Sequence, residues 1–202
     1  MKDFLPIPKP TKAIRATKEP KPKTKTTRTI KTKKTVGSTK KKDKHTQSWY
    51  RQEALRLAQK YAKYRESFGG ATADERYCNC ISCGKRLSLA GTAGRAEGGH
   101  YVTRMCKVTE LEPDNIHPQC HTCNCYFGGN EVAYRFNLVK KIGEDRVKRL
   151  ELMFAASKGD EEALNQLEER DQIEVLRVRP SSYYKGKIEE FKQLIKKEQE
   201  KW

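Results

Sequence analysis

Two Cys-x-x-Cys pairs constrain this chain more than any other feature of its sequence. The first is CISC at residues 80–83, the second is CHTC at residues 120–123, and 36 residues separate them. Each pair can turn two thiolates toward one metal ion from a tight turn, and Gly84 suits the bend after the first pair. Two such turns complete the tetrahedral four-sulfur shell that structural zinc prefers. We therefore expect one structural Zn²⁺ bound by Cys80, Cys83, Cys120 and Cys123.

Two alternative interpretations are that these cysteines are four free thiols, or that they form two thioredoxin-like redox pairs. A redox pair requires a βαβ context that the sequence does not offer. Residues 84–104 are also poor in large apolar side chains, so a metal ion would supply the stability that burial cannot. Of the three further cysteines, Cys78 and Cys125 could each replace a neighbouring ligand, and Cys106 is expected to be an ordinary thiol.

Charge is distributed unevenly along the chain. The protein has 43 Lys and Arg against 26 Asp and Glu, a net charge of +17, and residues 1–45 hold 16 of the basic residues with only three acidic ones. This Lys-, Thr- and Pro-rich segment has almost no large apolar side chains, so we expect a disordered basic tail. Neutralising phosphates with Lys and Arg releases condensed counterions, which favours DNA as a partner. A solubilising leader without a partner is the alternative.

We do not expect a membrane location. No apolar run approaches the roughly 18 residues that a spanning helix needs, and the N-terminus lacks the apolar stretch of a signal peptide. Closely spaced cysteines in a reducing compartment hold metal more often than they form disulfides. The sequence therefore predicts a cytoplasmic protein.

Apolar periodicity predicts helices on both sides of the cysteine region. Ser48 is the expected N-cap of a first helix over 48–67, which Gly69-Gly70 would end. The segment at 173–179 can be a strand or a helix continuation. Further helices are expected at 131–142, at 144–156, at 160–170, and from a cap at Ser181 or Ser182 to about Lys201.

These elements divide the chain into three parts. We expect the disordered basic tail at 1–45, a zinc-stapled domain with its flanking helices at 46–156, and a C-terminal helical extension at 157–202.

Three short motifs lie between and around the cysteine pairs: GGHY at 98–101, NIHPQC at 115–120 and CNCYFGGN at 123–130. Together with CISCG they resemble the zinc-knuckle version of the HNH endonucleases, and more specifically the NinG (Rap) recombination proteins of lambdoid phages. The resemblance covers about Ser48–Leu150 and is tight across Cys80–Arg135. It implies an α+β fold with a small ββα-metal (HNH-like) core on the four-cysteine site, and hence a nuclease domain.

The resemblance also implies a function. That family is associated with phage recombination and with binding and cleaving branched DNA such as Holliday junctions and D-loops. This chain would then be a structure-specific, metal-dependent endonuclease in the cytoplasm of a bacterial host, working beside a host or phage recombinase. Symmetric cutting of a junction would favour a homodimer, although the sequence shows no coiled-coil seam.

Three positions match the HNH pattern. His100 matches the first His, the general base that takes a proton from the attacking water, and a pKa near neutrality suits an imidazole to that task. Asn115 matches the central Asn, which orients the His-bearing loop through hydrogen bonds. Asn124 matches the final position, which is a metal ligand. The resemblance implies Mg²⁺ or Mn²⁺ as the catalytic ion, since both suit oxygen-rich ligands.

The chain departs from the family pattern at two places. Many HNH enzymes have an Asp metal ligand directly before the first His, where this chain has Gly99, and Glu97 is the nearest carboxylate that can replace it. A His-Lys pair often follows the second knuckle in NinG-like proteins, where Tyr126-Phe127 stand here. His117 and His121 are nearby imidazoles that can compensate as metal ligands.

The main alternative function is a module that binds branched DNA without cleaving it, because the metal ligands of the family pattern are missing at Gly99 and Tyr126. An RNA-binding protein with a basic arm is a third class that the composition leaves open. In each case four basic residues are candidate phosphate contacts, although each can equally be a solvated surface charge: Arg95, Arg104, Lys107 and Arg135.

Overall fold

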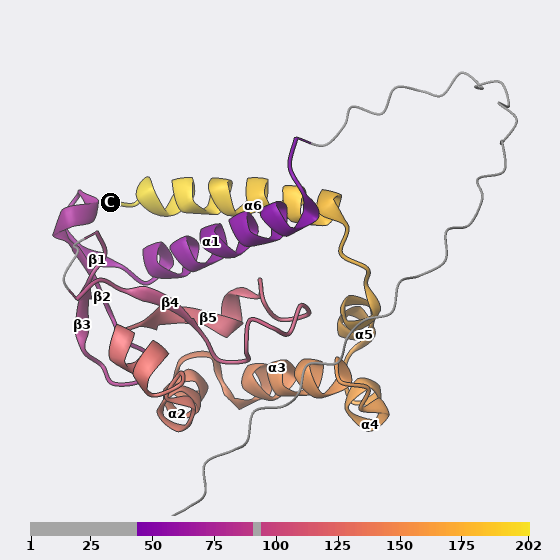
Figure 1. Cartoon of the computed structure of the whole chain (residues 1–202). Helices are drawn as coiled ribbons and strands as arrows, with labels where there is room; N and C mark the ends of the chain where they lie inside the picture. The colour runs from indigo at the N-terminus through magenta and orange to yellow at the C-terminus, as the bar shows by residue number, and fades with distance from the viewer. Residues whose placement is uncertain (1–43, 91–93) are drawn as a thin grey trace, which may run out of the picture. The chain divides into compact units, whose positions relative to one another are not determined.

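The computed structural model describes residues 44–90 and 94–202, which belong to one compact unit, Lys42–Trp202. Of the predicted basic tail at 1–45, all but Lys44 and His45 lies outside the described residues. Helices and two small antiparallel sheets make up the described part, so the predicted α+β class is confirmed (Figure 1). Within these residues, none of the helices combines the length and apolar character that crossing a lipid bilayer requires.

Helix α1 (Gln47–Arg65) supplies one side of the first hydrophobic core. Its N-cap is Thr46, whose hydroxyl accepts a hydrogen bond from the Trp49 N–H at 3.3 Å. The prediction of Ser48 as the cap is wrong. Thr46 has the extended backbone conformation of an N-cap residue, whereas Ser48 is already inside the first turn of the helix. The prediction that Gly69-Gly70 end the helix is also wrong, since the chain has already left the helix and Gly69 lies in a strand.

Helix α6 (Ser181–Gln199) runs alongside α1 and completes this core (Figure 1). It starts directly after Pro180, which has no capping side chain, so the predicted cap at Ser181 or Ser182 is wrong. The residues predicted as a C-terminal extension therefore pack on the helix that precedes the cysteine region. Four buried side chains recur at helical spacing on the α1-facing side of α6: Tyr184, Ile188, Phe191 and Ile195.

Helices α2 (Glu131–Ile142) and α3 (Glu144–Ala156) have the bounds predicted from the sequence and form a second core. Gly143 separates them with a φ of +89°, a backbone conformation that favours glycine. The side chains of these two helices that are most deeply buried are Tyr134, Leu138, Val147, Leu150 and Met153.

Two short helices, α4 (Glu161–Asn165) and α5 (Glu169–Leu176), stand where a single helix was expected at 160–170. That prediction is wrong because the chain turns between the two helices and buries Leu167 in the second core. The undecided segment at 173–179 continues α5 to its end and then has no regular structure, so it is not a strand.

The first sheet is antiparallel, with strands in the order β1 (Phe68–Gly69), β2 (Arg76–Asn79) and β3 (Arg86–Ser88). A turn of 3₁₀-helix, η1 (Ala73–Glu75), lies between β1 and β2. The connection from β2 to β3 carries the first Cys-x-x-Cys pair, so this sheet positions that pair.

The second sheet is the antiparallel pair of β4 (Glu97–His100) and β5 (Ile116–Gln119). Figure 1 shows this pair between α1 and α2. Strand β4 lies tight against α1, since a Cβ atom on Gly98 would lie 2.6 Å from the Cβ atom of Gln59. On the other side, the hydroxyl of Tyr134 in α2 donates a hydrogen bond to the β4 backbone at 3.1 Å.

Two short helical turns flank β5. A 3₁₀ turn, η2 (Pro113–Asn115), leads into the strand, and a π-helical turn, η3 (Thr122–Tyr126), follows it. The second Cys-x-x-Cys pair lies at the junction of β5 and η3. The chain therefore runs through both strands of the hairpin, then through Cys120, and then into the helical turn that contains Cys123.

Replacing Phe191 with Ala should lower the free energy of unfolding by about 3–5 kcal/mol, because the change leaves a cavity between α1 and α6. Phe136→Ala is the matched control: that ring is 61% exposed on α2, and its loss should cost less than about 1 kcal/mol. Denaturant unfolding followed by circular dichroism measures both variants. Equal losses would contradict the packing of α6 on α1.

Candidate functional site

The four cysteines predicted as zinc ligands lie together. Their sulfur atoms are all within 4.8 Å of one another, and the sulfurs of Cys83 and Cys120 are 3.8 Å apart. Tetrahedral Zn–S bonds of about 2.3 Å place the sulfurs about 3.8 Å from each other. The cluster could therefore hold a zinc ion. We call these residues the four-cysteine cluster: Cys80, Cys83, Cys120 and Cys123.

Backbone hydrogen bonds fix the two turns of the four-cysteine cluster against β5. The Gly84 N–H donates to the Cys80 carbonyl at 2.8 Å, and Gly84 has a φ of +72°, which the bend after the first pair requires. The Ile81 N–H donates to the Pro118 carbonyl of β5 at 2.8 Å. Cys120 follows β5 directly. The first turn is therefore attached to the strand from which the second turn begins.

The other three cysteines lie outside the four-cysteine cluster. Cys78 is fully buried, and burial raises the pKa of its thiol to about 12, which keeps it protonated. Cys106 is buried in the second core, where its sulfur lies 3.4 Å from the hydroxyl of Ser157. The Cys125 sulfur lies next to Glu97. Neither Cys78 nor Cys125 takes the place of a cluster residue.

Asn115 closes the loop between β4 and β5. Its side chain is fully buried, and its Oδ1 accepts a hydrogen bond from the Val102 N–H at 2.6 Å. Its Nδ2 donates to the carbonyls of Val102 and Thr109, both at 2.9 Å. A buried carboxamide with these three bonds fixes the backbone at two separate points of the loop. The loop that follows His100 is therefore held by one side chain.

His100 is the last residue of β4 and begins this loop. Its Nε2 lies 3.1 Å from the Glu110 carbonyl oxygen, which accepts the Nε2–H and leaves Nδ1 as the basic nitrogen. Burial lowers the pKa of the imidazole to about 4, so the ring is neutral at pH 7. A neutral imidazole held in this way can accept a proton at Nδ1.

Glu110 connects His100 to the first core. Its buried carboxylate is 2.6 Å from the Arg51 guanidinium of α1 and accepts a hydrogen bond from the Tyr184 hydroxyl of α6 at 3.1 Å. A carboxylate buried to this extent needs such donors to offset its lost hydration. The side-chain contacts of α1 and α6 therefore fix the residue whose carbonyl orients His100.

A second group of side chains with metal-binding chemistry surrounds Glu97. Glu97 Oε1 lies 2.7 Å from His121 Nδ1, and Oε2 lies 2.7 Å from Asn124 Nδ2. The Cys125 sulfur is 3.8 Å from Oε2. Partial burial alone would raise the pKa of Glu97, but the hydrogen bonds from Asn124 and His121 lower it and keep the carboxylate ionised. We call these four residues the Glu97 group.

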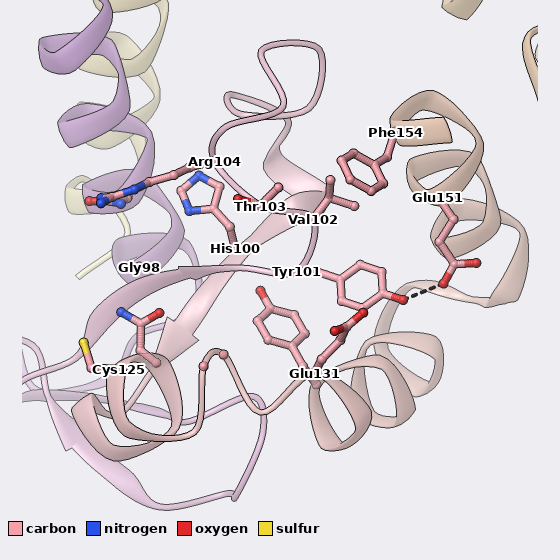
Figure 2. Close-up of a pocket in the computed structure, with 15 residues that line it drawn as sticks. Gly98, His100, Tyr101, Val102, Thr103, Arg104, Cys125, Glu131, Glu151 and Phe154 are labelled. Atoms are coloured by element: carbon pink, nitrogen blue, oxygen red, sulfur yellow. Dashed lines mark hydrogen bonds between the residues drawn. The ribbon is translucent and has the colours of Figure 1, made fainter. Parts of the chain in front are cut away.

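One cavity brings His100 together with part of the Glu97 group. Its volume is about 580 Å³, and Figure 2 shows His100, Arg104 and Cys125 among the residues that line it. Asn124 also lines this cavity. A basic nitrogen, a guanidinium and two side chains of the Glu97 group therefore face one space, although β4, the loop after it and η3 supply them separately.

His117, a predicted metal-ligand candidate, lies outside this arrangement. It is fully buried in β5, with Nδ1 2.5 Å from Glu66 Oε1 and Nε2 3.1 Å from the Asp114 carbonyl oxygen. Burial alone would raise the pKa of Glu66, but hydrogen bonds from His117 and Lys141 lower it to about 2. His117 therefore ties β5 to the end of α1.

The four predicted phosphate contacts differ in their surroundings. Arg95, Arg104 and Lys107 are exposed. The Arg104 guanidinium makes no hydrogen bond or ion pair with any residue in the ranges 44–90 and 94–202, and it lines the cavity. Arg135 is ion-paired with two glutamates at 2.6 and 2.8 Å, so its charge is already neutralised.

The packing of Gln119 accounts for the glycine before His100. A Cβ atom on Gly99 would lie 2.1 Å from Gln119 Oε1, so an Asp does not fit there while Gln119 holds its place. Gln119 is fully buried, and its Nε2 donates to the Ser82 hydroxyl at 2.8 Å and to the Gly129 carbonyl at 2.5 Å. Gln119 therefore links the turn of the first cysteine pair to the residues that follow η3. Sequence reasoning missed it because a single polar residue in a strand gives no signal of these partners.

The fold and these sites define a class: an α+β protein in which a four-cysteine cluster supports a β-hairpin and the helical turn after it. This chain belongs to the NinG family, since the family described as Bacteriophage Lambda NinG protein matches residues 8–180. The proteins named Protein ninG from Escherichia phage 933W, Escherichia phage lambda and Salmonella phage P22 are each 36% identical to it over 78 residues. That stretch covers 38% of this chain and 36% of the length of each relative. No solved structure matches the chain significantly.

Cys83→Ser should abolish tight zinc binding and lower the Tm, because three thiolates no longer complete the shell and much of the local stability comes from the ion. Cys106→Ser is the matched control, since it removes a thiol outside the four-cysteine cluster. Zinc per chain is measured by mass spectrometry of the metal after dialysis against a weak chelator. Retention of tightly bound zinc in Cys83→Ser at the level of the control would contradict the assignment.

Proposed function

We propose that this protein is a metal-dependent endonuclease of the HNH type that binds and cleaves branched DNA during phage recombination. One observation carries the proposal: His100, Arg104 and two members of the Glu97 group line the same cavity, and Arg104 has no ion-pair partner among the described residues. Metal-dependent phosphodiester hydrolysis uses a general base, a positively charged side chain that binds the phosphate, and a site for a divalent metal ion.

The order of the elements supports an HNH-like core of the ββα-metal type. Strand β4 ends at His100, the buried Asn115 clamps the loop that follows, and β5 leads into η3, which contains Asn124. In the family pattern a His, an Asn and a final Asn or His occupy these three places. The hairpin and the turn after it bring the outer two to one cavity, which a nuclease site needs.

Glu97, Asn124 and His121 are the residues that would hold a catalytic divalent cation. A carboxylate and a carboxamide oxygen suit Mg²⁺ or Mn²⁺, and the imidazole suits Mn²⁺ better than Mg²⁺. Asn124 now donates its Nδ2 to Glu97, so its carboxamide would turn over to offer Oδ1. Such an ion would stabilise negative charge on the phosphate and on the leaving oxygen.

His100 would act as the general base. Its Nδ1 would take a proton from a water molecule while the water oxygen attacks phosphorus. The bond from phosphorus to the leaving 3′ or 5′ oxygen would break, and that oxygen would keep the electron pair and take a proton from solvent. The Glu110 carbonyl holds Nε2–H throughout, so the ring keeps one orientation as it becomes charged. Arg104 would contact the phosphate, because its charge is not neutralised by a neighbouring carboxylate in the described part of the chain.

Recognition would rest on charge and shape rather than on base sequence. The net charge of +17 favours a polyanion, and the basic segment at 1–45 would add phosphate contacts that do not read bases. A host or phage recombinase would act beside the protein on the same DNA, and a homodimer would suit symmetric cutting of a junction.

A non-catalytic branched-DNA-binding module is the second candidate. The observation that favours it is Gly99, where the contact with Gln119 leaves no room for the Asp found in many HNH enzymes. If Glu97 does not replace that ligand, the same cavity would bind DNA without cutting it. Binding of an RNA hairpin in preference to a DNA junction would point to the RNA-binding alternative.

His100→Ala should lower the rate of Mg²⁺- or Mn²⁺-dependent nicking of a labelled four-way junction by roughly 10²–10⁴-fold, because the general base is lost. Junction affinity should stay within about twofold of wild type, since the imidazole is not a phosphate contact. His45→Ala is the matched control, as that residue precedes α1 and lies outside the cavity. Unchanged nicking in His100→Ala would reject His100 as the base, and no nicking by the wild type with Mg²⁺, Mn²⁺, Zn²⁺ or Co²⁺ would favour the binding module.

The pH dependence offers a further check on the same residue. The base must be neutral to act, and burial lowers the pKa of His100 to about 4. The nicking rate should therefore be nearly constant between about pH 6 and 8 and should fall as the pH drops through about 4. A rate that falls off between about pH 7 and 6 would show a base with an ordinary His pKa.

A further inference from the structure

We propose that Cys125 supplies a thiolate ligand to the cation site at Glu97, so that this site takes a zinc-class divalent ion through oxygen, nitrogen and sulfur together. The inference rests on the proposed function for the existence of a cation at this place. It adds the identity of the donors and hence the class of the metal. Cys125 would then have a role separate from the four-cysteine cluster.

The geometry brings three different donor atoms to one point. A carboxylate oxygen of Glu97, a ring nitrogen of His121 and the sulfur of Cys125 all lie within 4.8 Å of one another. Glu97 lies between the other two, with one oxygen 2.7 Å from His121 Nδ1 and the other 3.8 Å from the sulfur. Ligand bonds of about 2.0–2.3 Å from one ion span such separations.

The π-helical turn η3 explains why two metal-binding groups arise from six consecutive residues. Cys120 and Cys123 turn toward the protein interior and are buried, while His121 and Cys125 are exposed. The wider turn is closed by the Phe127 N–H, which donates to the Thr122 carbonyl at 3.0 Å. One side of the segment 120–125 therefore completes the four-cysteine cluster, and His121 and Cys125 on the other side lie next to Glu97 of β4.

The donor set selects the metal. The oxygen ligands alone suit Mg²⁺ or Mn²⁺, but thiolate and imidazole are softer ligands than carboxylate and water. With Cys125 as a ligand, the same site would therefore prefer Zn²⁺ or Co²⁺. Three protein ligands with further positions open to water or substrate are also typical of catalytic zinc sites. Cys125 is among the residues that line the cavity that contains His100 (Figure 2). An ion held at this place would be accessible from the cavity.

Cobalt spectroscopy of the full-length protein tests the inference. The four-cysteine cluster is first filled with one Zn²⁺ per chain, and Co²⁺ is then added in the presence of excess Mg²⁺. A sulfur–cobalt bond gives a charge-transfer band in the near ultraviolet, which oxygen and nitrogen ligands do not give. We expect this band in the wild type and in Cys106→Ser, and we expect it to be absent in Cys125→Ser. Co²⁺ affinity in Cys125→Ser should be at least about tenfold weaker.

Zinc released into solution is measured in the same titration, so that exchange at the four-cysteine cluster is detected and subtracted. A wild-type protein without the band, or a Cys125→Ser variant with a band of full intensity, would overturn the inference. The readout does not depend on DNA cleavage. A band without nicking would reject the nuclease and keep the thiolate ligand, whereas nicking without a band would do the reverse.

Discussion

The gathering of four sulfurs around one point is the constraint on which the rest of this structure depends. The strands of the cysteine region are short, and among the residues that the structure describes, the small core there consists of four cysteines with Leu87 and Ala96. Burial on that scale does not offset the entropy of ordering more than 50 residues of chain, but a zinc–thiolate centre can. Because Cys120 and Cys123 belong to the four-cysteine cluster, it also constrains the positions of the neighbouring His121, Asn124 and Cys125.

Buried polar side chains then connect the cysteine region to the two helical cores. Glu110 accepts bonds from α1 and α6 while its carbonyl holds His100, and Asn115 fixes the same loop from within. His117 joins β5 to the end of α1 through Glu66. Each of these groups would be costly to bury alone, and each has its partners. The hairpin is therefore held on both sides by specific contacts, and the cavity is lined by β4, the loop that follows it, and residues of η3.

The sequence predicts the local features of the structure well and the features that depend on long-range contacts poorly. Helical periodicity and Gly143 fix α2 and α3 to the residue, and the cysteine spacing alone predicts the cluster. The first helix cap was misplaced because Thr46 and Ser48 have the same chemistry, and only the backbone distinguishes them. The break near Leu167 comes from burial in a core built by other helices, which no local signal announces. The position of Cys125 beside Glu97 likewise depends on the pairing of β4 with β5, and the motif that contains Cys125 does not predict it.

The central claim is that one ion is shared by four sulfurs, and X-ray absorption at the zinc edge tests it most directly. The protein is prepared with one zinc per chain, so that only the tightest site contributes. The account predicts a first shell of four sulfur atoms at about 2.3 Å, with no nitrogen or oxygen. A shell containing imidazole nitrogen or carboxylate oxygen would contradict it, because the ion would then sit at Glu97 and leave the four thiols unbridged.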